Sequence, residues 1–234
     1  MPESLSIPSR FNGPLDSANG GYCAGVLAAF LMGAAEVSLR RPVPLDTTLE
    51  LFREDERSVR LLDGESLVAE AHAAPAPDVR VPPPVSPGEA RAAMEGYRGR
   101  SDGIFSRCFV CGPAREDAFG VFAGQVDGRE LVASPWTPPA WTADAAGDVR
   151  PEFVWAVLDW PTYFALYMDG EMPLSVLARL TGKVVAPIHA GEEHVVVAWP
   201  IEVDGRKHHA GSAVLSSEGE TLAVARALLI EPRA

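Results

Sequence analysis

The sequence DGESLVA at residues 63–69 returns in a similar form, EGETLAV, at residues 218–224. In both copies an acidic residue and a glycine come first, a pair that favours the tight turn of a β-hairpin. The small and branched apolar residues that follow are typical of a buried strand. Each heptapeptide therefore predicts a hairpin whose second strand enters a hydrophobic core.

The residues upstream of the two copies are also alike. A strand interrupted by proline and followed by a polar turn is expected at residues 39–46 and again at 184–191. Farther upstream, each half has one apolar helix, at residues 21–31 and 151–167. The second helix begins with Pro151, whose missing N–H costs nothing at a first helical position. Three matching features in the same order predict an internal duplication.

Proline crowds the sequence between the two copies. Six prolines fall between residues 74 and 103, where apolar periodicity is weak. Because proline fixes φ and removes a hydrogen-bond donor, we expect an extended linker that ends in a short helix over residues 87–97. The chain is accordingly predicted to divide into a first repeat (1–74), a linker (75–103) and a second repeat (104–234).

Composition and charge exclude several classes of protein. The 234 residues are 47% hydrophobic and 22% charged, which is typical of a globular protein with a real core. A net charge of −12 argues against a nucleic-acid-binding surface, and three cysteines are too few for a disulfide framework. The longest apolar run, residues 23–35, is too short to span a bilayer, and the N-terminus lacks a signal-peptide pattern. We therefore expect a cytoplasmic protein that binds neither nucleic acid nor membranes.

Short motifs in both halves point to one family. The first half contains Asn-Gly-Gly at residues 19–21 and Arg-Pro-Val-Pro at 41–44, and the second contains CFVCGP at 108–113 and Leu-Asp at 158–159. In this order the motifs resemble those of hotdog-fold acyl-CoA thioesterases of the PaaI-like and TesB-like types. The resemblance implies an α+β double hotdog, with two long helices packed on a curved antiparallel β-sheet, which can pair further into a homodimer. It also implies an acyl-CoA or other small-molecule thioester as the substrate, with coenzyme A as part of that substrate and no separate cofactor.

The two helices keep different parts of the family motif, in which an acid lies eight residues after the first glycine. Counting eight from Gly20 leads to Ala28, so the first helix has the glycines without the acid. Counting back eight from Asp159 leads to Pro151, so the second helix has the acid without the glycines. Since the site of hotdog dimers lies between two helices, the resemblance implies one surviving site, formed by residues 19–21 and Asp159.

Those residue types suit thioester hydrolysis. The helix N-terminus at Asn19, Gly20 and Gly21 offers N–H groups and the positive end of a dipole to the oxyanion of a tetrahedral intermediate. Asp159 would activate water as a general base or attack as a nucleophile. The Asn-Gly-Gly turn and Asp159 also have purely structural interpretations. Asn-Gly-Gly is a common turn and helix cap, and Asp159 could bond to backbone at the kink that Pro161 imposes.

Aromatic residues near Asp159 are candidates for binding the acyl group. Trp155, Trp160 and Tyr163 lie on the same predicted helix. They would form the walls of an aromatic acyl pocket, which would favour a bulky or aromatic acyl group. At helical spacing they could equally be ordinary core residues.

Polar residues on the strands of the second half are the remaining candidates. Arg206 and Lys207, on a basic hairpin, would hold the phosphates of coenzyme A, unless they are only the charges of an exposed hairpin. In TesB-type thioesterases an Asp acts with a Thr and a Gln on neighbouring strands, and Asp159 and Thr181 fit the first two. Where the Gln is expected, residues 226–229 read Arg-Ala-Leu-Leu. That departure leaves a non-catalytic acyl-CoA or small-molecule binding protein as the alternative to a thioesterase.

Other chemistries are disfavoured by the sequence. Cys108 and Cys111 form a CxxC pair, but no second pair or histidine at zinc-finger spacing follows, so we expect no metal site. A hydratase on the same fold would carry a histidine five residues after the acid, where this chain has Phe164. No Gly-rich phosphate loop or Gly-x-Ser-x-Gly nucleophile elbow occurs.

Overall fold

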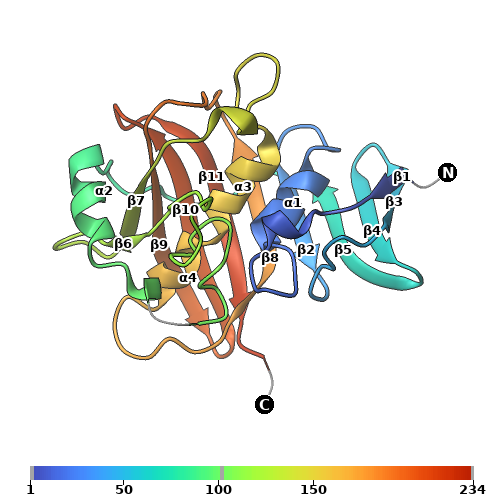
Figure 1. The fold of residues 1–234 in the computed structure, drawn as a ribbon, viewed down its shortest axis with the longest axis horizontal. Helices are drawn as coiled ribbons and strands as arrows, with labels where there is room; N and C mark the ends of the chain where they lie inside the picture. The colour runs from blue at the N-terminus through green and yellow to red at the C-terminus, as the bar shows by residue number, and fades with distance from the viewer. Residues whose placement is uncertain (1–2, 101–102, 233–234) are drawn as a thin grey trace.

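A computed structural model describes residues 3–100 and 103–232 (Figure 1). These residues form one eleven-stranded sheet in which every neighbouring pair of strands is antiparallel. The strands are β1 (Glu3–Leu5), β2 (Ala35–Leu39), β3 (Leu49–Asp55), β4 (Ser58–Asp63), β5 (Ser66–Ala73), β6 (Gly124–Gln125), β7 (Val132–Trp136), β8 (Val176–Val184), β9 (His194–Asp204), β10 (Lys207–Ser216) and β11 (Thr221–Ile230). The helices are α1 (Gly20–Ala28), α2 (Pro87–Met94), α3 (Pro151–Asp159) and α4 (Pro161–Leu166), with single turns of 3-10 helix at Ser9–Phe11, Arg98–Arg100 and Ala140–Thr142.

The order of strands is the same in the two halves of the sheet. Outward from the central β2–β8 pair, one half runs β2, β5, β4, β3, β1, and the other runs β8, β11, β10, β9, β7, with β6 at the edge. Helices α1 and α3 occupy equivalent places in the chain, directly before β2 and before α4 and β8. Both predicted hairpins are confirmed, β4–β5 turning at Gly64 and β10–β11 at Gly219. These glycines have φ of 56° and 89°, a conformation that glycine adopts without strain.

The predicted helices are present but shorter than expected. Helix α1 ends at Ala28, and the expected second helix is divided at Trp160, where Pro161 begins α4. Proline lacks the N–H for the helical ladder and its ring crowds the preceding turn, so a continuous helix is disfavoured there. The described α1 and α3 are nine residues each, and their final residues, Ala28 and Asp159, are the pair that the sequence comparison aligned.

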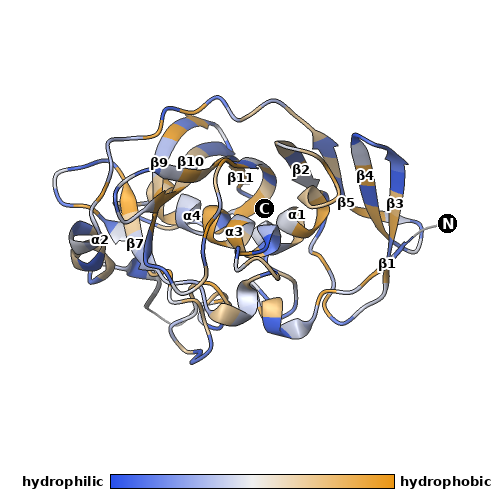
Figure 2. Ribbon diagram, turned by 90° about the horizontal axis from the view of Figure 1, so that it is seen from above, coloured by the Kyte–Doolittle hydropathy of each residue, from blue (hydrophilic) through white to orange (hydrophobic). Residues whose placement is uncertain are grey.

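Helices α1 and α3 cross in an antiparallel arrangement at two glycines of α1. A Cβ on Gly21 would lie 2.5 Å from the carbonyl oxygen of Trp155, and one on Gly25 would lie 2.5 Å from the Cα of Glu152. The first turn of α1 therefore meets the last turn of α3. A residue larger than glycine at position 21 or 25 would keep the two backbones farther apart. Figure 2 shows both helices, with α4, on the same side of the sheet. Together with that face of the sheet they enclose the main hydrophobic core.

The proline-rich segment packs on the opposite face of the sheet. Val79, Val81 and Val85 contact a second hydrophobic cluster that includes Val195 and Trp199 of β9. In Figure 2 the segment passes above the sheet, away from α1 and α3. The short helix expected at its end is confirmed as α2, which begins with a capping box at Ser86.

The division into repeats 1–74 and 104–234 and a linker 75–103 stays a prediction. Residues 101–102 of that linker, and residues 1–2 and 233–234 of the repeats, lie outside the described residues. None of the described helices has the length and apolarity that a membrane crossing would require.

Candidate active site

Asp159, the last residue of α3, lies against the first turn of α1. Its Oδ2 accepts a hydrogen bond of 2.9 Å from the backbone N–H of Gly21, 138 residues away in the chain. A Cβ on Gly21 would lie 2.5 Å from the Cβ of Asp159, so only glycine permits this approach. The carboxyl group and the glycine turn, which the sequence assigned to one site, are in direct contact.

The surroundings of Asp159 change its acidity. The residue is 8% exposed. Burial raises the pKa of Asp159 from its ordinary 3.8 to about 7, and the hydrogen bond from Gly21 acts in the opposite direction. A carboxyl group with such a pKa gains and loses a proton near neutral pH, which is the property that a general base needs.

The residues of the turn have different roles in the structure. Asn19 caps α1, because its Oδ1 accepts a hydrogen bond of 2.9 Å from the N–H of Tyr22. The N–H of Gly21 is engaged by Asp159. The N–H of Gly20 donates to no residue that the structure describes, and Gly20 faces a cavity. Of the three turn residues, Gly20 is therefore the one whose amide remains for a ligand.

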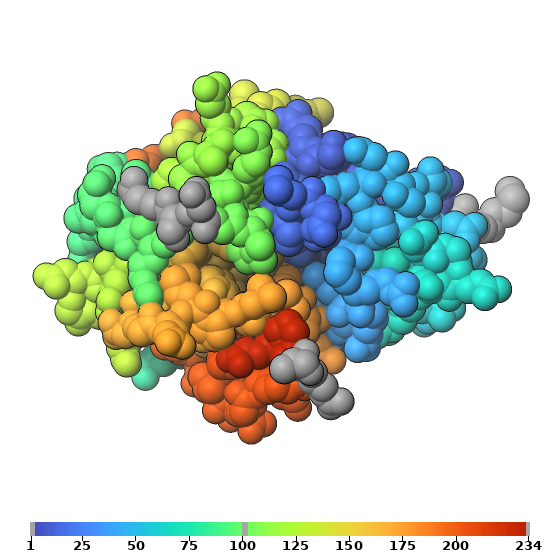
Figure 3. All heavy atoms as spheres, turned by 60° about the horizontal axis from the view of Figure 1, so that its bottom comes forward, coloured from blue at the N-terminus to red at the C-terminus, as the bar shows by residue number. Residues whose placement is uncertain are grey.

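A cavity of about 840 Å³ opens beside this turn. Its volume is within the range of sites that hold small molecules. Figure 3 shows the face of the molecule on which its walls meet around a hollow, with the blue first half against green and orange segments of the second. The lining comprises residues 13–20 before α1, 39–43 after β2, 104–105, Asp159, Trp160 and Tyr163, 174–178 at the start of β8, and 229–230 at the end of β11.

Two of the three predicted aromatic residues line the cavity. Trp160 and Tyr163 do so, with their ring centroids 5.9 Å apart, and the Phe105 ring packs edge-on against Trp160 at 4.5 Å. Trp155 does not line it: this side chain is 2% exposed and packs against Gly182 of β8. Trp155 is thus a core residue, as the structural interpretation of these aromatics proposed.

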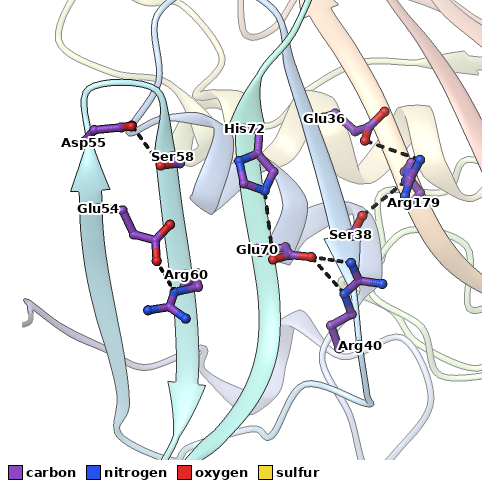
Figure 4. Close-up of polar contacts among 10 residues, drawn as sticks. All are labelled: Glu36, Ser38, Arg40, Glu54, Asp55, Ser58, Arg60, Glu70, His72 and Arg179. Carbon is purple, nitrogen blue, oxygen red and sulfur yellow. Dashed lines mark hydrogen bonds and ion pairs between the residues drawn. The ribbon is translucent and has the colours of Figure 1, made fainter.

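Thr181 lies on the face of β8 that points away from Asp159. Side chains alternate along a strand, and its neighbours Leu180 and Gly182 face the core and Trp155. The Thr181 hydroxyl instead contacts Glu36 of β2 at 3.3 Å. Figure 4 shows Glu36 on the sheet, paired with Arg179 of β8. The structure therefore does not bring Thr181 together with Asp159.

Arg206 and Lys207 also lie outside the residues that line the cavity. Arg206 donates to the backbone oxygen of Glu231 at 2.6 Å, and Lys207 is exposed on the β9–β10 hairpin. The basic side chains at the cavity are instead Arg40 and Arg41, which the sequence analysis did not name as site residues. A sequence feature that could have indicated Arg41 is the Arg-Pro-Val-Pro motif, which follows β2 at the centre of the sheet.

The CxxC pair lies behind the glycine turn. Cys108 and Cys111 are fully buried, and the Sγ of Cys108 is 3.9 Å from the Nδ2 of Asn19 and 3.4 Å from the N–H of Val110. The part of the chain that the structure describes contains no group of three or more His, Cys, Asp or Glu residues arranged to hold a metal ion. The contact with Asn19 indicates that this motif helps to hold the N-terminus of α1.

Comparison with known proteins supports the fold through structure alone. No protein-family model and no curated protein matches the sequence. A structure from Novosphingobium aromaticivorans that was assigned as a thioesterase is similar at 10% identity and a TM-score of 0.63, covering 98% of this chain and 95% of that one. An acyl-CoA thioesterase II from Mycobacterium marinum covers 99% and 93% at 10% identity and a TM-score of 0.60. A hotdog-fold protein from Alicyclobacillus acidocaldarius covers 99% and 93% at 12% identity and a TM-score of 0.56. The chain therefore has the hotdog fold, the fold of these thioesterases.

Proposed function

We propose that this protein hydrolyses acyl-CoA thioesters, with Asp159 as the general base and the N-terminal turn of α1 as the oxyanion site. The observation that carries the proposal is the contact of Asp159 with the Gly21 N–H at the wall of the 840 Å³ cavity. A carboxyl group titrating near neutrality and a free amide at Gly20 are the two groups that hydrolysis of a thioester requires.

In the proposed reaction, Asp159 removes a proton from a water molecule, and the water oxygen attacks the thioester carbonyl carbon. The negative charge that develops on the carbonyl oxygen is stabilised by the Gly20 N–H and by the positive end of the α1 dipole. The carbon–sulfur bond then breaks, and the proton held by Asp159 passes to the thiolate. The products are a carboxylic acid and free coenzyme A.

The experiment that tests the proposal follows the release of free thiol from a panel of acyl-CoAs by the purified protein. Hydrolysis of one or more acyl-CoAs supports it. Repeated turnover in water labelled with ¹⁸O then tests for a nucleophilic Asp159. Label found in its carboxyl group would identify a nucleophile, because water places it there only by attacking the Asp159 carbonyl of an anhydride intermediate; a general base stays unlabelled.

The alternative is a non-catalytic protein that binds an acyl-CoA or another small molecule. It is favoured by the strands beside the site, because Thr181 faces away from Asp159 and its cross-strand neighbour on β11 is Arg226. If no acyl-CoA is hydrolysed but coenzyme A raises the melting temperature, the binding function is the correct one.

We further propose that the chain is a double hotdog in which the two repeats replace the two subunits of a hotdog dimer. The mirrored strand order about the β2–β8 pair and the contact of α1 with α3 support this. The corresponding expectations of a cytoplasmic location and of further pairing into a homodimer stay proposals.

A further inference from the structure

The mouth of the cavity carries an unpaired cation. Arg41 is exposed, lines the cavity, and makes no hydrogen bond or ion pair with any residue that the structure describes. Its neighbour Arg40 lines the same cavity but is held by Glu70 of β5, as Figure 4 shows. In a chain with a net charge of −12, a free guanidinium at a ligand cavity is a specific feature rather than part of a basic surface.

The same mouth carries an apolar rim. Four large apolar residues that line the cavity are between 46% and 67% exposed: Leu15, Ile104, Leu174 and Val176. Large apolar side chains gathered at the edge of a cavity indicate that a partly apolar ligand covers them. The rim and Arg41 together describe a ligand with an apolar or amphipathic arm and an anionic end.

We propose that Arg41 anchors the phosphate groups of the coenzyme A portion of the substrate, with the pantetheine arm lying across the apolar rim towards Asp159. The inference rests on the proposed hydrolysis of acyl-CoA and adds the residue that selects a phosphate-bearing thioester. Arginine suits this role because its guanidinium forms charge-assisted, bidentate hydrogen bonds with phosphate oxygens. It replaces Arg206 and Lys207, which lie outside the cavity lining, as the phosphate-binding group.

The test compares two substrates with the same acyl group, the acyl-CoA and the acyl-N-acetylcysteamine thioester, which lacks the phosphates. Arg41→Ala is expected to raise the KM for acyl-CoA roughly tenfold, the size of one lost charge-assisted hydrogen bond, with kcat unchanged. The KM for the N-acetylcysteamine thioester is expected to stay the same. Arg80→Ala is the matched control, since Arg80 is exposed and unpaired among the described residues but does not line the cavity.

A second variant makes the test independent of a loss of folding. Asp16 is an exposed acidic residue in the cavity lining, and its negative charge opposes phosphate binding. Asp16→Asn is therefore expected to lower the KM for acyl-CoA, the opposite direction to Arg41→Ala. An equal effect of Arg41→Ala on both thioesters, or no effect on either, would overturn the role of Arg41.

Calorimetric titration with free coenzyme A separates this inference from the proposed function. If the parent binds coenzyme A and Arg41→Ala weakens that binding roughly tenfold, the anchor is correct even when no thioester is hydrolysed. If acyl-CoA is hydrolysed and Arg41→Ala binds coenzyme A as tightly as the parent, the hydrolase function stands and the anchor is wrong.

Discussion

Replacing Asp159 with asparagine is expected to stabilise the folded protein at alkaline pH. The side chain is buried, and its carboxyl group has a folded-state pKa of about 7 against an ordinary 3.8. Ionising it in the folded state is therefore harder than in the unfolded chain. Because the folded pKa is the higher one, the folded state holds the proton between these two values, and stability falls as pH rises through that range. Asparagine keeps an oxygen that can accept from the Gly21 N–H but has no charge to bury.

The size of the effect follows from the pKa difference. One pKa unit corresponds to about 1.4 kcal/mol, so ionised Asp159 destabilises the folded protein by about 4 kcal/mol at pH 8. At pH 5 Asp159 is largely ionised in the unfolded chain but not in the folded protein. Asp159 then destabilises the folded protein by about 2 kcal/mol. The advantage of Asp159→Asn should therefore grow by about 3 kcal/mol between pH 5 and pH 8, a further rise of roughly 6 to 12 °C in relative Tm for a chain of this size.

Urea denaturation of the parent and Asp159→Asn at both pH values measures this directly. Asp144→Asn is a suitable control, since Asp144 is exposed and lies outside the cavity lining. A variant that is no more stable than the parent at pH 8, or whose advantage does not change between pH 5 and pH 8, would refute the reasoning from burial.

Three further predictions concern the glycine turn, the cavity and β8. Gly21→Ala should lower the free energy of unfolding by roughly 1 to 3 kcal/mol and remove most of the activity, because the added Cβ meets the backbone of α3. Gly20→Ala should lower the free energy of unfolding by less, because its Cβ meets only the side-chain ends of Leu177 and Leu39, at 3.0 Å. Thermal melting of both variants checks this, and equal losses would contradict it. Leu177→Trp should fill part of the cavity. It should lower kcat/KM for the largest accepted acyl group roughly tenfold or more, with little change in Tm. Unchanged kinetics would show that the substrate lies outside this cavity. Thr181→Val should keep kcat within about twofold of the parent, because the hydroxyl contacts Glu36 and not Asp159; a large fall in kcat would return Thr181 to the catalytic set.

The features that the sequence predicted correctly depend on local chemistry. The turns at Gly64 and Gly219 need a positive φ that glycine supplies, so two short peptides were enough to locate both hairpins. Counting along the helices aligned Ala28 with Asp159, because both helices have the same length and start at equivalent points.

The features that the sequence missed depend on which face a residue occupies. Thr181 was assigned through a motif, but a strand residue moves to the other face with a shift of one position, and only the neighbours in space reveal its side. The place of Arg41 at the cavity mouth likewise depends on residues far away in the chain, including Leu174 and Val176 at the start of β8. The packing of the proline-rich segment through Val79 and Val85 could not be predicted, since its sequence has no regular apolar spacing.

The most direct test of the proposed site is the rate of acyl-CoA hydrolysis by the parent and by Asp159→Asn between pH 5.5 and pH 9. The parent's kcat/KM is expected to rise with pH through a midpoint near 7, as Asp159 loses its proton. Asp159→Asn should be slower by roughly 100-fold or more at every pH, without that midpoint. An asparagine variant that hydrolyses acyl-CoA as fast as the parent would contradict the assignment of Asp159 and the site built on it.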